Sequence, residues 1–395
     1  MADKPIDGEE QPVSSVILHH KYSLEDGHVA AQICRVDGYK GIMLTKEPRS
    51  KQSEIPFASV ASPAQESAGM KLLNVSDAPR MTPIVSLEDI KREPRLLKQL
   101  QISGVHIHHG SLAPKFLFLK EKYGIPLFAS FRGKDATVYP KKKQGRAELR
   151  RLFQTGDLFF PVCHHLKKMI VKLGCPEEKV RVLYGGVDLD RFQDRPRQWE
   201  PGKKIRFLAI GRFVEKKGFT DLIHAFAVLK KKIPHVKLTL IGQGPCEAEY
   251  RKLIRLYKLG RSVQIIPWVS YHDIQKKYYQ SHIFCAPSCT DKEGNQEGIP
   301  NTVKEAMATG MPVISTTHAG IPELVKHKVS GLLVPEKSRA ELAKAMIWLA
   351  GHPETWNRYG MEARKKVETD FNLARQLEKQ KAYYDEIIMK QTGKK

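Results

Sequence analysis

Two groups of charged residues in the C-terminal half of this 395-residue sequence have types and spacing that suit the binding of a diphosphate. The first group lies in the loop GRFVEKKG, from Gly211 to Gly218, which follows the apolar run IRFLAI and opens an amphipathic stretch. Arg212 and Lys217 lie in this loop. A guanidinium fork and an ammonium group near a helix N-terminus suit a diphosphate clamp. The alternative is a surface loop with two solvated cations.

The second group lies in the segment 291–312, where Glu297 and Glu305 are eight positions apart. Pro300 suits the first turn of a helix, whose N–H groups are free to bind an anion. The two carboxylates and these amides suit a nucleotide-sugar, with one carboxylate for sugar hydroxyls, the amides for phosphate and the other carboxylate for ribose. The alternative is an acidic loop that caps an ordinary helix. The residues expected to line the donor are Gly298, Ile299, Pro300, Asn301 and Thr302.

Short apolar runs alternate with amphipathic stretches through most of the chain, which favours parallel sheets covered by helices. In the C-terminal half, the predicted strands are 205–210, 236–241, 263–267, 283–286, 313–316 and 332–334. The predicted helices there are 218–231, 246–259, 271–279, 300–308, 322–325 and 338–349. Six strand–helix units in series predict a Rossmann-like domain.

The N-terminal half shows the same alternation less regularly. Its predicted strands are 16–20, 42–45, 105–108, 126–131, 158–162 and 180–184, and its predicted helices are 23–36, 87–100, 113–123, 145–154 and 166–173. The segment 46–83 is left without a prediction. We therefore expect an α/β protein of two Rossmann-like domains, 1–190 and 200–370, that face each other across a cleft. A charged link lies near 188–204, and a last helix, about 373–395, is expected to pack back on the first domain.

The composition predicts a cytoplasmic protein with anionic partners. The formal net charge is +23, the pI is about 9.6, and both halves are basic, which suits nucleotide phosphates or an anionic membrane at the inner face of the plasma membrane. The sequence has no long apolar run or signal peptide, and its six cysteines have no zinc spacing. The stretches 141–151 and 166–173 are the candidate membrane contacts, with ordinary helices that have solvated basic faces as the alternative. We expect no nucleic-acid partner, because no basic motif is interleaved with aromatic residues.

The order and wording of these motifs resemble the retaining GT-B glycosyltransferases of the family-four clan. The resemblance rests on the G-R…K-G loop, the pair Glu297 and Glu305, and the runs EAMATGMPVIST and HAGIPELV, and it covers nearly all of 205–370. These sequence motifs are most similar to those of the bacterial exopolysaccharide and colanic-acid branch of the family. The GT-B fold with its donor site in the C-terminal domain is what the resemblance implies.

The resemblance implies a role for each donor-site residue. Arg212 and Lys217 would neutralise the donor diphosphate beside Gly211, Glu297 would hold the sugar hydroxyls, and Glu305 would bind the ribose. The base-contacting turn of the family corresponds to IIPWVS, which includes Trp268 but has Pro267 where the family usually has Gly. In the run IGQGP, Gly242 and Gly244 would let the backbone approach the nucleotide, or they simply form a tight turn.

The first half resembles the family more loosely. The run VHIHHG places His108 and His109 at a strand end, and SFRGKDATVY has Arg132 where the family has a histidine in the cleft. Arg132 would keep a phosphate contact as a permanent cation, although it cannot act as a base. Asp135 would orient Arg132 or an acceptor hydroxyl. Gly27, in the loop after the first predicted strand, is the candidate for acceptor binding.

The function that the resemblance implies is metal-independent, retaining transfer of a hexose-type sugar from a UDP- or GDP-sugar to a glycan or lipid-linked acceptor. Positioned cations and helix amides can stabilise the leaving diphosphate without a metal ion. No cofactor is expected beyond the nucleotide-sugar co-substrate. The alternatives are another GT-B enzyme, such as an epimerase or a phosphorylase, and a basic binding protein without activity.

Overall fold

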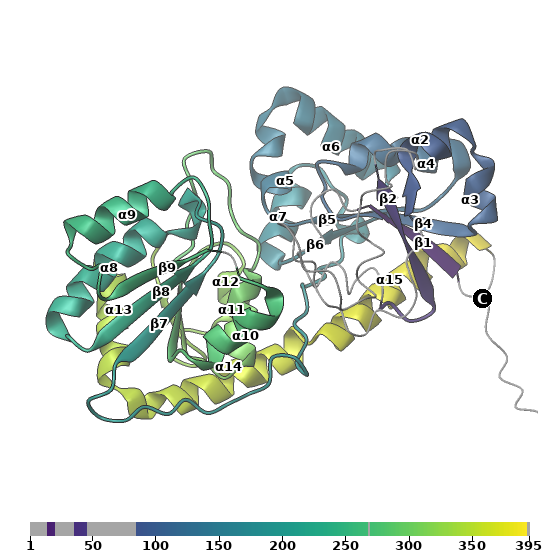
Figure 1. Ribbon diagram of the computed structural model, residues 1–395. Coiled ribbons are helices and arrows are strands. Elements are labelled where there is room, and N and C mark those ends of the chain that lie inside the picture. The colour runs from purple at the N-terminus through teal and green to yellow at the C-terminus, as the bar shows by residue number, and fades with distance from the viewer. Residues whose placement is uncertain (1–13, 20–34, 46–83, 268, 393–395) are drawn as a thin grey trace, which may run out of the picture.

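The protein contains two six-stranded sheets, each with helices packed around it (Figure 1). The structure, a computed structural model, describes residues 14–19, 35–45, 84–267 and 269–392. The strand order is β3-β2-β1-β4-β5-β6 in the first sheet and β12-β11-β10-β7-β8-β9 in the second, and every strand pair is parallel. Both sheets therefore have the same doubly wound order, and the predicted pair of Rossmann-like domains is confirmed.

The first sheet forms the N-terminal domain. Its strands are β1 Ser14–His19, β2 Tyr39–Thr45, β3 Ile84–Ser86, β4 Ile102–Ile107, β5 Leu127–Phe131 and β6 Leu158–Pro161. Its helices are α2 Leu87–Arg92, α3 Arg95–Gln99, α4 Leu117–Tyr123, α5 Lys134–Thr137, α6 Lys143–Thr155 and α7 His164–Lys172. The interior strand β5 is buried at every position, as expected for a parallel sheet covered on both faces.

The second sheet forms the C-terminal domain. Its strands are β7 Ile205–Ile210, β8 Val236–Ile241, β9 Val263–Ile266, β10 Ile283–Ala286, β11 Val313–Thr316 and β12 Leu332–Val334. Its helices are α8 Phe219–Lys232, α9 Glu247–Leu256, α10 Tyr271–Tyr279, α11 Asn301–Ala308, α12 Ile321–Leu324, α13 Arg339–Gly351 and α14 Trp356–Asp370. The chain order reverses between β7 and β10, so the loops after these two strands meet at the switch point where doubly wound sheets bind ligands.

Helix α15, Leu373–Thr392, leaves the second domain and runs along the first, as the yellow helix of Figure 1 shows. Its Tyr384 and Ile388 are buried in a cluster with Phe128 and Phe160 of the first sheet. The chain crosses between the domains twice, and the two crossings are paired: the N–H of Val187 donates to Phe371 O at 2.8 Å, and that of Leu373 donates to Val187 O at 3.0 Å.

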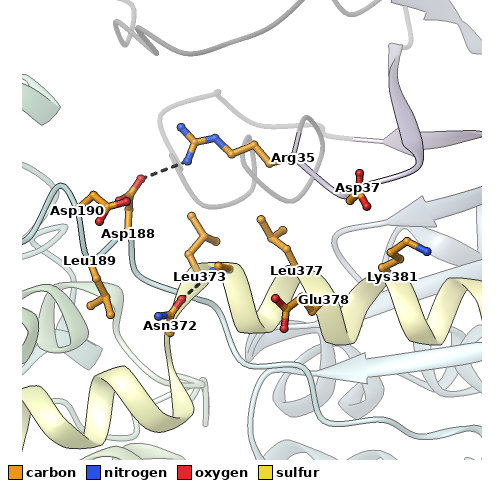
Figure 2. A pocket seen from close by; sticks show the side chains of 11 residues that line it. Arg35, Asp37, Asp188, Leu189, Asp190, Asn372, Leu373, Leu377, Glu378 and Lys381 are labelled. Carbon is orange, nitrogen blue, oxygen red and sulfur yellow. Dashed lines mark hydrogen bonds and ion pairs between the residues drawn. The ribbon is translucent and has the colours of Figure 1, made fainter. Parts of the chain in front are cut away.

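A pocket lies beside this crossing (Figure 2). Arg35 Nη1 pairs with Asp188 Oδ2 at 3.2 Å on one side of it, and α15 contributes Leu377 and Lys381 on the other. None of the residues that line it is one of the site residues predicted above.

Three predictions about the first domain need correction or fall outside the described residues. The segment 180–184 is not a strand: Arg181 and Leu183 donate N–H groups to β6, but the ladder stops after one bridge because Pro161 has no N–H to return. The predicted helix 87–100 is two helices, α2 and α3, which are separated just before Arg95 by Pro94. The helix predicted at 23–36 falls mostly outside the described residues, as does the whole of 46–83.

Candidate active site

The predicted cationic loop and the loop after β10 pack directly on each other. Gly218 has a φ of 66°, and a Cβ there would lie 1.9 Å from Pro287 O, so only glycine fits this contact. The N–H of Cys289 donates to Lys216 O at 2.9 Å. Backbone contacts alone therefore hold the two loops together at the switch point.

Glu297 lies at the centre of this junction, between two ammonium groups. Lys217 Nζ is 3.1 Å from Glu297 Oε1, and Lys216 Nζ is 3.3 Å from the same oxygen. The three side chains are only 10–15% exposed. Burial alone would raise the pKa of Glu297, but Lys217 and Lys216 outweigh it and lower that pKa to about 2. The carboxylate is therefore ionised at neutral pH and forms ion pairs with both lysines.

Lys216 was not predicted as a site residue, although it precedes Lys217 in the sequence. Burial lowers the pKa of Lys216, and Glu297 opposes that shift. A Lys-Lys pair at the start of a helix was the available signal, but adjacent residues commonly point apart, and the sequence does not show that both ammonium groups reach one carboxylate.

Arg212 lies on the same loop and is exposed. Among the described residues it has no ion-pair partner, and it is near enough to Lys216 to contribute to the lowered pKa of that group. Two cations thus contact Glu297 and a third lies near one of them, so the site has an excess of positive charge for an incoming anion.

Helix α11 begins directly beyond this cluster. Pro300 is its N-cap residue, and Asn301 is the first helical residue, so the first-turn N–H groups lie a few residues from Glu297. Glu305, within α11, is buried, and Tyr278 donates a hydrogen bond to its Oε2 at 2.7 Å. Tyr278 on α10 contacts this helix, and Lys304 within the helix donates its ammonium hydrogen bond to Gly185 O; neither residue was predicted from the sequence.

Two glycines predicted to approach the nucleotide have another structural reason to be glycine. A Cβ on Gly242 would lie 2.0 Å from Gly211 O, and a Cβ on Gly244 would lie 2.6 Å from Phe213 O. Their φ values, 145° and 153°, are also unfavourable for other residues. These glycines let the loop after β8 pack against the loop after β7. A direct nucleotide contact stays a prediction, and Trp268 and Gly27 lie outside the described residues.

On the opposite side of the cleft, Asp135 organises the loop that carries Arg132. Its buried carboxylate accepts the N–H groups of Arg132, Gly133 and Gly110 at 2.9–3.1 Å. Asp135 therefore fixes the backbone of Arg132, and its predicted role in the site stays a prediction.

Arg132 is held against the end of β4. Its Nε donates to His108 O at 3.0 Å, and its Nη2 lies 3.2 Å from His108 Nδ1. His108 stacks on His106 with the ring centroids 4.3 Å apart, and both rings are buried. Burial first, and Arg132 second, lower the pKa of His106 to about 3. His109 is partly exposed at the end of the same run.

The two loops meet across the cleft. A Cβ on Gly133 would lie 2.4 Å from Gln296 O, and His165 Nε2 is 2.8 Å from Gln296 Oε1. Glu323 of the second domain also accepts the N–H groups of His164 and His165 at the start of α7, at 2.9 and 3.0 Å. Gln296 directly precedes Glu297, so the loop that carries Arg132 contacts the residue next to Glu297.

No group of three or more potential metal-ligating side chains occurs in the part of the chain that the structure describes. The polar groups that meet at the cleft are instead lysine and arginine cations, carboxylates and helix amides. Such groups can bind and stabilise a diphosphate.

Two parallel Rossmann-like domains with facing switch-point loops define the GT-B class. Solved structures share this fold: the Anabaena protein HepE in complex with UDP has a TM-score of 0.73 and 14% identity, over 95% of this chain and 100% of that chain. A glycosyltransferase from Rickettsia africae has a TM-score of 0.73 and 18% identity, over 95% of this chain and 98% of that chain. At these identities the likeness shows the fold alone.

Two family models identify the chain more closely. Glycosyl transferases group 1 matches residues 190–366, and Glycosyltransferase Family 4 matches residues 61–191. The chain therefore belongs to the glycosyltransferases with a family 4 domain followed by a group 1 domain, as the motifs predicted.

Among curated relatives, the putative colanic acid biosynthesis glycosyltransferase WcaL of Escherichia coli is 35% identical over 61% of this chain and 60% of its own length. The amylovoran biosynthesis glycosyltransferase AmsK of Erwinia amylovora is 33% identical over 67% and 64%. The matches span less than two thirds of the length of these relatives.

Proposed function

We propose that this protein transfers a hexose-type sugar from a UDP- or GDP-sugar to a glycan or lipid-linked acceptor in polysaccharide synthesis, with retention of configuration and without a metal ion. The observation that carries the proposal is the buried junction of Glu297 with Lys216 and Lys217 beside the start of α11. The names of the relatives WcaL and AmsK, and the UDP complex of HepE, support a nucleotide-sugar donor and a polysaccharide pathway.

The ion pairs of the junction suggest how a donor is received. Both lysines form ion pairs with Glu297 in the structure. A diphosphate offers these lysines and Arg212 a stronger anion, and their shift toward it would free Glu297 to accept hydrogen bonds from the sugar hydroxyls. The ammonium groups then already face the oxygen on which negative charge develops as the glycosidic bond to the phosphate breaks.

Retention follows if the acceptor attacks from the face that the diphosphate leaves, with a phosphate oxygen taking the acceptor proton. No carboxylate nucleophile is needed for this route. Glu297 is paired with two cations, which suits hydrogen bonding to the sugar better than attack on it. We expect Arg132, which His108 and Asp135 hold on the facing loop, to contact the same phosphate.

The test uses Lys217→Ala and Glu305→Ala with a panel of UDP- and GDP-sugars, and analysis of the product anomer. We expect both variants to lose donor affinity and turnover, and the wild-type protein to keep its activity in EDTA. Unchanged donor affinity in both variants would overturn the donor site, an inverted product would overturn retention, and a strict Mg²⁺ requirement would overturn metal independence.

We further propose that the protein works at the cytoplasmic face of the plasma membrane, where a lipid-linked acceptor would be found. No described helix is long and apolar enough to cross a bilayer. Helix α6 and the residues before it carry an exposed row of cations: Lys141, Lys142, Lys143, Arg146, Arg150 and Arg151. Such a row suits anionic lipid headgroups. Co-sedimentation with vesicles that contain 30% phosphatidylglycerol, but not with neutral vesicles, is expected; equal binding to both would contradict it.

A further inference from the structure

The loop that carries Glu297 is held at both of its ends by one pair of side chains from elsewhere in the second domain. At the loop start, the N–H of Thr290 donates to Glu336 Oε2 at 2.7 Å. At its end, the N–H of Glu297 donates to His318 Nε2 at 3.0 Å. His318 Nδ1 and Glu336 Oε1 are 2.7 Å apart, so the pair closes a continuous chain of hydrogen bonds from one end of the loop to the other.

This chain of hydrogen bonds determines where the proton of His318 lies. A backbone N–H can only donate, so His318 Nε2 must accept from Glu297. Glu336 accepts from Thr290 and from His318, and although burial alone would raise its pKa, these hydrogen bonds lower it, so the carboxylate is ionised. His318 therefore carries its proton on Nδ1 and donates it to Glu336.

We propose that His318 and Glu336 are positioning residues for the transfer: they fix the backbone of Glu297 so that its carboxylate meets the sugar. This inference rests on the proposed function. Neither residue needs to touch a substrate, since His318 acts through the Glu297 N–H and Glu336 acts through His318. His318 is fully buried, so solvent cannot replace its hydrogen bonds when they are lost.

The geometry makes the loop sensitive to protonation of His318. Burial lowers the pKa of this imidazole and outweighs the opposing effects of Glu336 and Glu297, while His165 from α7 lowers it further. The same junction also holds Lys216 and Lys217, which are paired with Glu297, and Arg212, which lies near Lys216. A proton on Nε2 would place one donor against another, so turnover should fall on the acid side of the ordinary histidine pKa of 6.5.

Two variants of similar size separate the hydrogen bonds of His318. In His318→Gln, the amide oxygen can still accept from the Glu297 N–H, where Nε2 did. In His318→Asn, the shorter amide can donate toward Glu336 but cannot reach Glu297. Glu336→Gln keeps an oxygen that can accept from His318 Nδ1, but it removes the negative charge that favours the proton on that nitrogen. His352→Asn, at an exposed histidine whose Nδ1 lies 2.8 Å from Trp348 O, is the matched control.

The experiment measures kcat, KM, the Kd for UDP and GDP, and amide hydrogen exchange over residues 290–298 in the full-length protein. We expect His318→Asn to lower kcat about 10- to 100-fold with nucleotide Kd within about twofold of wild type, and to speed exchange in this loop. His318→Gln should retain more activity and shift the acid limb of the pH profile, and His352→Asn should match wild type.

Equal losses in the Gln and Asn variants, or unchanged exchange in the loop, would overturn the positioning role. A wild-type protein that binds no nucleoside diphosphate would contradict the proposed function instead. The exchange measurement still tests the role of His318 in that case, because it needs no substrate.

Discussion

Glu297 and Asp135 are buried carboxylates on opposite sides of one cleft, and they are held in different ways. Glu297 faces the ammonium groups of Lys216 and Lys217, whereas Asp135 accepts three backbone N–H groups of its own domain. Side-chain cations can turn to a new anion without unfolding anything, but backbone amides cannot. The second domain therefore presents an exchangeable charge site, while the first presents a fixed frame for Arg132.

The largest expected effect comes from removing the charge of Glu297. Glu297→Gln should lower kcat about 10²- to 10³-fold because the sugar loses its anionic acceptor. It should also bind UDP or GDP at least as tightly as wild type, since both lysines become free for phosphate. Steady-state kinetics and calorimetric titration check this. A large loss of nucleotide affinity would mean that the lysines need Glu297 to hold them and cannot exchange.

Removal of Asp135 should affect stability instead. Asp135→Ala leaves three N–H groups without their acceptor in a buried loop, and the free energy of unfolding should fall by about 3–6 kcal/mol. Denaturant unfolding measures this, with the exposed Asp190→Ala as control. Nucleotide affinity of the folded variant should fall less than that of Lys217→Ala, because only the frame of Arg132 is lost, and a larger loss of affinity would contradict this role of Asp135.

Acid should remove the stabilising contributions of His106 and Glu297 in different pH windows. The lowered pKa of His106, about 3 against 6.5, contributes stability that is complete above pH 6.5 and lost as pH falls toward 3. The lowered pKa of Glu297, about 2 against 4.5, contributes stability that is lost only below pH 4.5. His106→Gln should therefore reduce the slope of the unfolding free energy against pH between pH 6.5 and 4.5, as measured by urea unfolding. An unchanged slope would show that another group titrates there.

The smallest expected effect is that of Arg212. Because this side chain is exposed, Arg212→Ala should weaken diphosphate binding only about tenfold, and the loss should shrink as salt rises. Titrations at two ionic strengths check this. A loss that does not depend on salt would indicate that Arg212 binds the ligand in a buried position.

The parts of the site that are contiguous in sequence could be predicted, and those assembled from distant residues could not. The G-R…K-G loop and the start of α11 follow β7 and β10, so strand order alone places them together. His318 lies 21 residues from Glu297 and 18 from Glu336, and no local pattern links them. The sequence also did not show that Asp135 accepts three backbone N–H groups, because such contacts require only a single carboxylate and no recognisable pattern around it.

The fold shows the same division. Regular apolar runs predicted the strands of the second sheet closely, with β9 ending one residue before Pro267. Pro161 kept 180–184 from forming a strand, although its apolar pattern favours one, because a ladder depends on the partner strand as well. Helix α14 had no prediction, and the three-residue β3 was too short to show a period.

The most direct measurement of the central claim is a calorimetric titration of the wild-type protein, the double variant Lys216→Ala/Lys217→Ala and the control Lys231→Ala/Lys232→Ala with UDP and with GDP. The control removes an exposed lysine pair at the other end of α8. We predict that wild type and control bind one of the two nucleotides equally and that the double variant loses at least about 100-fold in affinity. Equal affinity in all three proteins would contradict a diphosphate site at Glu297.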